Sequence, residues 1–181
     1  MNTPIYYVDA FTDSLFSGNP AAVIFSDIND ASLMQLIAAE NNLSETAFIR
    51  LENDKYFIRW FSPSCEIDLC GHATLASAFI YFNYINTKAT EFEVHSLKNG
   101  ALKVSQNADY LYLDFPKDNI QEDDEYTSSI VDVLGGIVPK EIFRGRDDLL
   151  VILDKESDIE ELQPDFALLK KIPLRGIIVS A

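Results

Sequence analysis

The segment from His72 to Ile85 constrains the fold of this chain more than any other. Its sequence, HATLASAFIYFNYI, contains no Asp, Glu, Lys or Arg, and the next charged side chain is Lys88. Apolar side chains cover most of the circumference of the helix that it predicts: Ala73, Leu75, Ala76, Ala78, Phe79, Ile80 and Phe82. A helix that is apolar on nearly all sides belongs in the interior of a protein. The sequence therefore predicts a central helix over residues 72–85, wrapped by other elements.

Strand-like segments lie on both sides of this helix in the sequence. They are rich in β-branched and aromatic residues and cover 5–11, 21–25, 45–51, 55–61, 91–96, 101–106 and 110–115. Asn53 and Asp54 join two of them and indicate a β-hairpin. The pattern predicts an α+β fold in which a strongly curved sheet, or barrel, surrounds the central helix.

A second helix is predicted over residues 30–42. Asp30 is its candidate N-cap, because a side-chain oxygen there can accept from the free backbone N–H groups of the first turn. Its apolar face is expected to combine Leu33, Met34, Ile37 and Ala38.

Composition changes near residue 117. All but three aromatic side chains lie in residues 1–116, the exceptions being Tyr126, Phe143 and Phe166. The polar run KDNIQEDDEY, which follows Pro116, is typical of a linker or a solvated loop. We therefore expect a first domain over 1–116 and the beginning of a second over 117–181.

Charge and cysteine content exclude several classes of protein. The chain carries 29 Asp and Glu against 14 Lys and Arg, a formal net charge of −15, which argues against nucleic acid and anionic membranes as partners. Its apolar runs are shorter than the roughly 18 residues of a membrane span, and its first residues lack the basic region of a signal peptide. With no export signal, Cys65 and Cys70 are expected to be reduced thiols. We expect a cytoplasmic location.

Gly71 and His72 open the central helix and are the first candidates for chemistry. The backbone N–H groups of a first helical turn, here those of Gly71, His72 and Ala73, have no partners within the helix and can bind a carboxylate. Glycine also lets a ligand approach the backbone closely. The alternative is that Gly71 only turns the chain and that His72 forms a local hydrogen bond.

Glu45 is the candidate general acid or base. It begins a strand whose alternation places it on one face with Ala47, Ile49 and Leu51. If that face lines the core, the carboxylate lies at the core's rim, where it can transfer protons. The alternative is an exposed glutamate at the start of a strand, or one that serves as a capping partner.

Cys70 directly precedes the helix, and a thiol at a helix N-terminus can act as a nucleophile or base. A small buried thiol without function is the alternative. Metal binding is not predicted, because Cys65, Cys70 and His72 lack a fourth ligand at suitable spacing.

Three stretches resemble the PhzF-like phenazine-biosynthesis family, whose members are relatives of diaminopimelate epimerase. They are VDAFTDSLFSGNPAAVIF (8–25), AAENNLSETAFI (38–49) and RWFSPSCEIDLCGHATLASAF (59–79), in the order and at the spacing of that family. The resemblance over residues 117–181 is loose.

The resemblance implies a diaminopimelate epimerase-like fold with two similar domains, each a sheet around a central helix, and an active site between them. It implies isomerisation by proton transfer without cofactor or metal, commonly in a homodimer. It places the general acid/base on Glu45 and the binding of the substrate carboxylate on Gly71 and His72. Ala73 and Asn19 are added as expected binding residues.

The family's second domain contributes a stretch of the type Asp-Pro-Val-x-Gly-Ser-Ala-His to the active site. This sequence ends at GIIVSA (176–181), before any such stretch. We therefore expect residues 117–181 to form an incomplete, truncated second domain.

Three hypotheses follow. The first is an isomerase or epimerase in which Glu45 moves a proton on a small carboxylate-bearing metabolite, as half of a two-domain active site. The second is a racemase that uses Cys70 as its acid or base. The third is a non-catalytic fragment or interaction module that pairs with a missing half.

Overall fold

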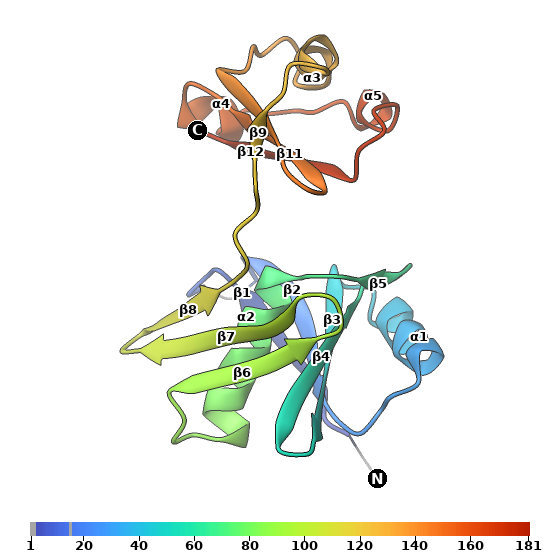
Figure 1. Cartoon of the computed structure of the whole chain (residues 1–181), viewed down its shortest axis with the longest axis vertical. Coiled ribbons are helices and arrows are strands. Elements are labelled where there is room, and N and C mark those ends of the chain that lie inside the picture. Colours follow the sequence, from blue (N-terminus) through green and yellow to red (C-terminus); the bar gives the residue numbers. More distant parts are fainter. Residues whose placement is uncertain (1–2, 15) are drawn as a thin grey trace. The chain divides into compact units, whose positions relative to one another are not determined.

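The computed structural model describes residues 3–14 and 16–181 of the chain. The chain divides into two compact units, Met1–Pro116 and Lys117–Ala181 (Figure 1). Each unit has its own sheet and its own hydrophobic core.

The first unit is built on one curved, mixed sheet. Its strand order is β1-β2-β3-β4-β6-β7-β8, with the two-residue β5 paired to β4. The strands are β1 Tyr6–Ala10, β2 Asn19–Phe25, β3 Glu45–Glu52, β4 Lys55–Phe61, β5 Glu66–Ile67, β6 Glu91–Ser96, β7 Gly100–Asn107 and β8 Tyr110–Asp114. The strands predicted from the sequence are all present, whereas β5 was not predicted.

Two parallel pairs set the places of the two helices in this unit. β2 pairs with β3 in parallel, and so does β4 with β6, while the remaining pairs are antiparallel. A parallel pair requires a crossover connection. The first crossover contains helix α1 (Ala31–Asn41) and the second contains helix α2 (Gly71–Ile80).

The two helices lie on opposite faces of the sheet. On β3, Ala47 and Ile49 belong to the core around α2, whereas Phe48 packs with Met34 and Ala38 of α1. The strand is therefore buried on both faces over most of its length. Only its far end departs from the predicted pattern, because Leu51 is 53% exposed.

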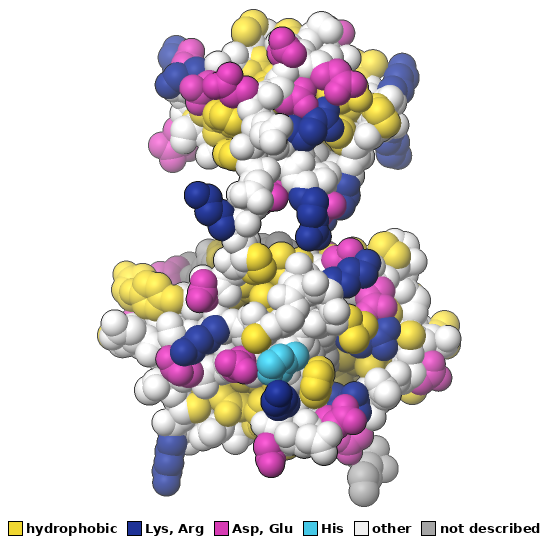
Figure 2. All heavy atoms as spheres, viewed as in Figure 1, with side chains coloured by type: hydrophobic (Ala, Val, Ile, Leu, Met, Phe, Trp, Pro, Cys, Tyr) yellow, Lys and Arg dark blue, Asp and Glu magenta, His cyan; other side chains and the backbone are white. Residues whose placement is uncertain are grey.

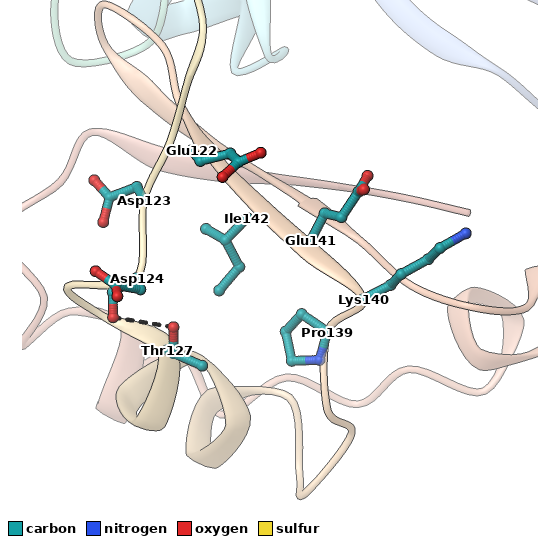
Figure 3. A pocket seen from close by; sticks show the side chains of 8 residues that line it. All are labelled: Glu122, Asp123, Asp124, Thr127, Pro139, Lys140, Glu141 and Ile142. Carbon is teal, nitrogen blue, oxygen red and sulfur yellow. Dashed lines mark hydrogen bonds between the residues drawn. The ribbon is translucent and has the colours of Figure 1, made fainter.

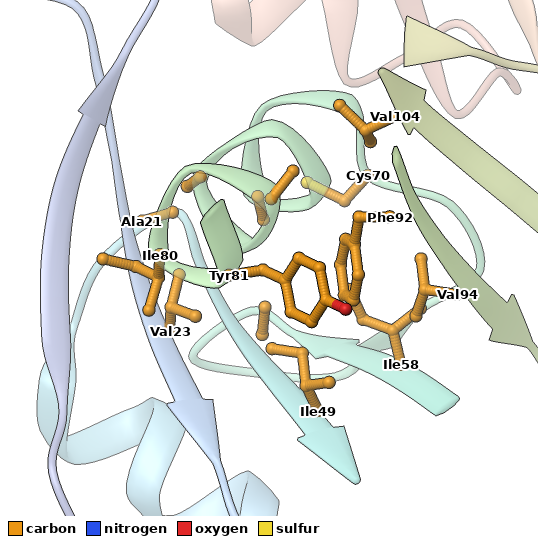
Figure 4. Packing of buried hydrophobic residues seen from close by; sticks show 14 of the residues in the cluster. Ala21, Val23, Ile49, Ile58, Cys70, Ile80, Tyr81, Phe92, Val94 and Val104 are labelled. Atoms are coloured by element: carbon orange, nitrogen blue, oxygen red, sulfur yellow. The ribbon is translucent and has the colours of Figure 1, made fainter. Parts of the chain in front are cut away.

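α2 is the central helix predicted from the sequence. Its buried residues are Ala73, Thr74, Ala76, Ser77, Ala78 and Ile80, and β2, β3, β4, β6 and β7 contribute the apolar residues around it (Figure 4). The prediction is wrong for Phe79, whose side chain is 44% exposed. The α2 core thus leaves one side of the helix open.

Two polar residues are tolerated inside α2 because they bond to the helix itself. The hydroxyl of Thr74 donates to the carbonyl of Cys70 at 2.6 Å, and that of Ser77 donates to the carbonyl of Ala73 at 2.6 Å. A buried hydroxyl with a partner avoids most of the cost of leaving water.

The predicted helix 72–85 changes geometry at its end. Residues Tyr81–Ile85 form a π-helix, in which Asn86 N–H donates to the carbonyl of Tyr81. Tyr81 stacks on Phe92 of β6, with ring centroids 4.4 Å apart (Figure 4). It also meets Tyr56 edge-on, with ring centroids 5.3 Å apart. π-Helices occur mostly as single turns within α-helices. This one lies where Tyr81 joins a cluster of aromatic rings.

The expected caps and turns of the first unit are present. The side chain of Asp30 accepts from Ser32 N–H, which confirms it as the N-cap of α1. Leu33 was wrongly placed on the buried face and is 44% exposed. Asn53 and Asp54 have φ values of 49° and 61°, as a type I′ hairpin turn between β3 and β4 requires.

The second unit contains a smaller sheet with the strand order β12-β11-β10-β9. The strands are β9 Gln121–Glu122, β10 Glu141–Arg144, β11 Asp148–Ile152 and β12 Gly176–Ser180, and the helices are α3 Thr127–Val133, α4 Glu156–Glu160 and α5 Phe166–Leu169. Its buried core combines α3, β10 and β11 with nearby loops: Ile130, Val133, Leu134, Ile142, Leu149, Val151, Leu153 and Ile172.

Surface charge is mixed on the face shown in Figure 2, where single Lys and Arg side chains lie between acidic ones. Among the described residues, none of the helices has the length and apolar character that crossing a membrane would need.

Candidate active site

The candidate site lies where β3 and α2 begin. Glu45 is the first residue of β3, and His72 is the second residue of α2. Oε2 of Glu45 lies 3.2 Å from Nε2 of His72, and the two side chains are 18% and 10% exposed. Residues 27 positions apart in the sequence thus form a largely buried pair at the rim of the α2 core.

His72 links the carboxylate to a thiol. Its second ring nitrogen, Nδ1, lies 3.4 Å from Sγ of Cys70, and one donor atom from each of Glu45, Cys70 and His72 lies within 4.8 Å of the other two. Burial lowers the pKa of His72, although the charge of Glu45 and the carbonyl of Pro20 act in the opposite direction. The imidazole is therefore neutral at neutral pH.

Burial also controls the chemistry of Cys70. It raises the pKa of the thiol to about 12, and neighbouring Glu45 acts in the same direction. The backbone N–H groups of Ala73 and His72 oppose this shift. A thiol with such a pKa stays protonated at neutral pH, so it is a poor base and a poor nucleophile.

Among the described residues, the backbone N–H groups at the start of α2 have no partners within the helix, and those of His72 and Ala73 lie near the Cys70 thiol. The first N–H group with an intrahelical partner is that of Thr74, which donates to the carbonyl of Cys70. Cys70 is the N-cap, and within the described part of the chain its side chain makes no capping hydrogen bond. The preceding N–H groups, of Gly71, His72 and Ala73, lie at the positive end of the helix dipole.

Gly71 is not required by the backbone or by packing. Its φ lies outside the left-handed region where glycine is favoured. A Cβ built on it would meet Phe115 Cε2 as its nearest described neighbour, at an ordinary 3.6 Å. The interpretation that Gly71 only turns the chain is thereby weakened, since an alanine would fit there.

Asn19 lies on the same face of the sheet as Glu45. It precedes Ala21 by two residues on β2, and Ala21 is the parallel partner of Glu45. Ser44, next to Glu45, donates a hydrogen bond from its hydroxyl to Oδ1 of Asn19 at 3.2 Å. This bond orients the carboxamide beside the start of β3.

The structure thus brings Glu45, Cys70, Gly71, His72 and Ala73 together, with Asn19 beside Glu45. Cys65 is exposed and outside the cluster, and sequence spacing did not indicate Glu45 as a ligand next to Cys70 and His72. Ser44 and the Pro20 carbonyl were missed as well. The only sequence signal for these two residues is that Ser44 precedes Glu45 and Pro20 follows Asn19.

The second unit has a hollow with a volume of about 500 Å³. Figure 3 shows its walls, which include Glu122, Glu141 and Lys140, all exposed. Asp123, which also lines it, pairs with Arg144 of β10, which holds the pKa of that carboxyl below its usual range. Glu122, Glu141 and Lys140 are solvated charges. Asp123 is more buried than Glu45, with 11% of its side chain exposed, but it is held in an ion pair with Arg144 and so has a structural role.

Comparison with known proteins gives a consistent match. Residues 8–181 match the family model described as phenazine biosynthesis-like protein. An uncharacterized isomerase of Halalkalibacterium halodurans is 44% identical over 182 residues, which cover 100% of this chain and 68% of that protein.

Solved structures agree with the match. A PhzF-family phenazine biosynthesis protein of Enterococcus faecalis is 42% identical, with a TM-score of 0.88 over 99% of this chain and 68% of that one. A PhzC/PhzF protein described as putative, from Clostridium difficile, is 37% identical, with a TM-score of 0.84 over 99% and 69% of the two chains. The predicted epimerase-like α+β fold is therefore confirmed.

Proposed function

Because the chain belongs to the family of phenazine biosynthesis-like proteins, we propose that it is a cofactor-independent isomerase of small carboxylate-bearing metabolites. Glu45 is the group that moves the proton. The observation that supports this most is the placement of a largely buried carboxylate against the first turn of α2, 3.2 Å from His72. The coarser assignment, to an isomerase-type family, agrees with the name of the H. halodurans relative.

The substrate carboxylate binds to the N–H groups of Gly71, His72 and Ala73. These donors are fixed by the helix before the substrate arrives, so they need no reorganisation during the reaction. Gly71 carries no side chain that would stand between the carboxylate and the backbone. The amide of Asn19 supplies a further polar contact on the same face.

Glu45 then accepts a proton from a carbon of the bound substrate. The electron pair of the broken C–H bond is delocalised into the adjacent unsaturated or carboxylate group, whose growing negative charge is stabilised by the helix N-terminus. Glu45 returns the proton to another position or face of the same substrate. Atoms and charge balance without an external oxidant or reductant.

Neutral His72 positions the carboxylate. Its imidazole packs against Glu45 within the core rim, and an uncharged ring does not hold the carboxylate in a fixed ion pair. The catalytic oxygen thus stays available for the substrate. The same burial that keeps His72 neutral keeps Cys70 protonated, so Glu45 is favoured over Cys70 as the base.

In this proposal the site forms one half of a cleft. We propose in addition that a second, similar domain supplies a facing half-site and that the protein is a homodimer. The chain spans 68% of the length of the H. halodurans isomerase.

The test is carbon–hydrogen exchange with solvent. The protein is incubated in D₂O with a panel of small carboxylic acids that carry an acidic C–H bond, and deuterium incorporation is followed by NMR. We expect incorporation into at least one acid, and its loss in Glu45→Gln. The matched control is Glu52→Gln, at the exposed end of the same strand, which should exchange like the unaltered protein. Incorporation that survives Glu45→Gln, or none into any acid, would contradict the proposal.

A further inference from the structure

We infer that Glu45, Cys70 and His72 form a binding site for Zn²⁺ or a similar thiophilic divalent cation, and that the bound ion blocks the proton-transfer site. The binding stands on the geometry alone. The inhibition rests in addition on the proposed function.

The three donor groups already have nearly the spacing of metal ligands. A tetrahedral zinc ion has bonds of about 2.3 Å to sulfur and about 2.0–2.2 Å to nitrogen or oxygen, so its ligand atoms lie roughly 3.3–3.8 Å apart. With Nε2 as the ligand atom of His72, its distance to Oε2 of Glu45 is 3.2 Å, and one donor atom from each of the three residues lies within 4.8 Å of those of the other two. Changes in side-chain rotamer that move the donor atoms by about 1 Å would bring all three to the ligand distances of a tetrahedral zinc ion.

His72 provides a second, independent sign of a missing partner. Its side chain is only 10% exposed, and its Nε2 atom is buried without a hydrogen-bond partner among the described residues. Although Oε2 of Glu45 is 3.2 Å away, the two groups are not aligned for a hydrogen bond. A buried polar atom without a partner costs free energy, and a cation between the ring and the carboxylate would remove that cost.

The donor set selects the kind of ion. One thiolate, one imidazole and one carboxylate suit Zn²⁺ or Co²⁺, whereas Mg²⁺ and Ca²⁺ prefer oxygen ligands alone. Three protein ligands leave a fourth position for water, as in many zinc sites with an open position. The Glu45 side chain is 18% exposed against 10% for that of His72, so the carboxylate marks the side from which the ion enters.

Binding changes the state of each ligand. The ion displaces the thiol proton of Cys70, which leaves to solvent as a new zinc–sulfur bond forms. Neutral His72 offers a ring lone pair, and the Glu45 carboxylate offers an oxygen lone pair. Two negative ligands then neutralise the dication. Because the Glu45 oxygen is bound to the metal, it can no longer accept a proton from carbon.

Cobalt serves as the spectroscopic probe. The protein carrying Cys65→Ser is titrated with Co²⁺, since Cys65 is exposed and would bind the ion on its own. We expect a sulfur-to-cobalt charge-transfer band in the near ultraviolet and the intense visible bands of tetrahedral cobalt. Added Zn²⁺ should remove both, and Cys65→Ser/Cys70→Ser should show neither. A weak octahedral spectrum without the sulfur band would overturn the inference.

Affinity for Zn²⁺ is measured by competition with a chromogenic chelator. In the Cys65→Ser background, Cys70→Ser and Glu45→Gln should each weaken binding by more than about tenfold, since even the loss of an outer-shell partner can have that effect. Glu52→Gln is the control and should leave the affinity unchanged. Equal affinities in all variants would contradict the site. Neither measurement uses turnover, so a failure here leaves the proposed function untouched. Inhibition of C–H exchange by Zn²⁺ is expected only if both the metal site and the proposed function of Glu45 are correct.

Discussion

At Cys70, burial turns a residue that could be a nucleophile into a protonated neighbour of Glu45. Its thiol lies 3.4 Å from Nδ1 of His72 and has Glu45 as a charged neighbour. Its position at a helix N-terminus does not compensate for the loss of water. The sequence shows the helix N-terminus but not the desolvation, so the sequence by itself leaves Cys70 open as an acid or base.

Alkylation distinguishes the two cysteines. With iodoacetamide at pH 8, exposed Cys65 should react rapidly, and Cys70 should react only when the protein unfolds, because the thiolate is the reactive form and the Cys70 pKa is raised to about 12. Intact mass against time measures both rates. In Cys65→Ser, only the slow reaction should remain. Rapid modification of that variant in its folded state would contradict the assigned burial and pKa.

A substitution at Gly71 should affect ligand access without lowering the stability of the fold. Gly71→Ala should keep or raise the stability by about 0.4–1 kcal/mol, since alanine fits the backbone and restricts the unfolded chain. It should nevertheless reduce carboxylate-dependent exchange, because the methyl group occupies the approach to the first-turn N–H groups. Denaturation and the D₂O assay measure the two effects.

The matched control is Gly100→Ala, at a φ of +69°. It should lower stability and leave exchange intact. If Gly71→Ala exchanges as fast as the unaltered protein, the carboxylate does not bind at this turn.

Helix α2 is the element on which the site depends. Its lack of charge was sufficient to predict a buried helix, and the strand pattern was sufficient to predict the sheet around it. The π-helical end at Tyr81 and the exposure of Phe79 were not predictable, because they depend on which side chains of β6 and β4 the helix meets. Strand β5 has two residues, too few for any sequence period to be visible.

Alanine substitutions at two adjacent residues of α2, one buried and one exposed, test which side of the helix is buried. Ile80→Ala should lower the free energy of unfolding of the first unit by about 2–5 kcal/mol, as expected for a large side chain deleted from a packed core. Phe79→Ala, at a position 44% exposed, should cost less than half as much. Fluorescence of Trp60, the chain's one tryptophan and 1% exposed in the α2 core, reports the unfolding. Equal losses would contradict a helix with one open side.

At the scale of the whole molecule, the chain contains separate cores. The two clusters of the first unit draw all their residues from positions up to 116, and the cluster of the second unit draws all of its residues from later positions. The change in aromatic content near residue 117 indicated this division. The site residues come from both ends of a long connection, Glu45 to His72, so only the folded sheet could bring them together.

The separate cores predict that residues 1–116 fold alone. A fragment of these residues should unfold cooperatively, with a Trp60 transition close to that of the whole chain, because its core residues are all present. Chemical denaturation followed by fluorescence measures this. A fragment that lacks a cooperative transition would show that the second unit is needed for folding.

The most direct test of the account compares binding with exchange in a single variant, Glu45→Gln. Binding of a substrate acid is measured by calorimetry, and exchange of its C–H bond is measured in D₂O. If Glu45 moves the proton while the first turn of α2 holds the carboxylate, the variant should bind the acid with nearly unchanged affinity and exchange none of it. Exchange at the rate of the unaltered protein would contradict the account.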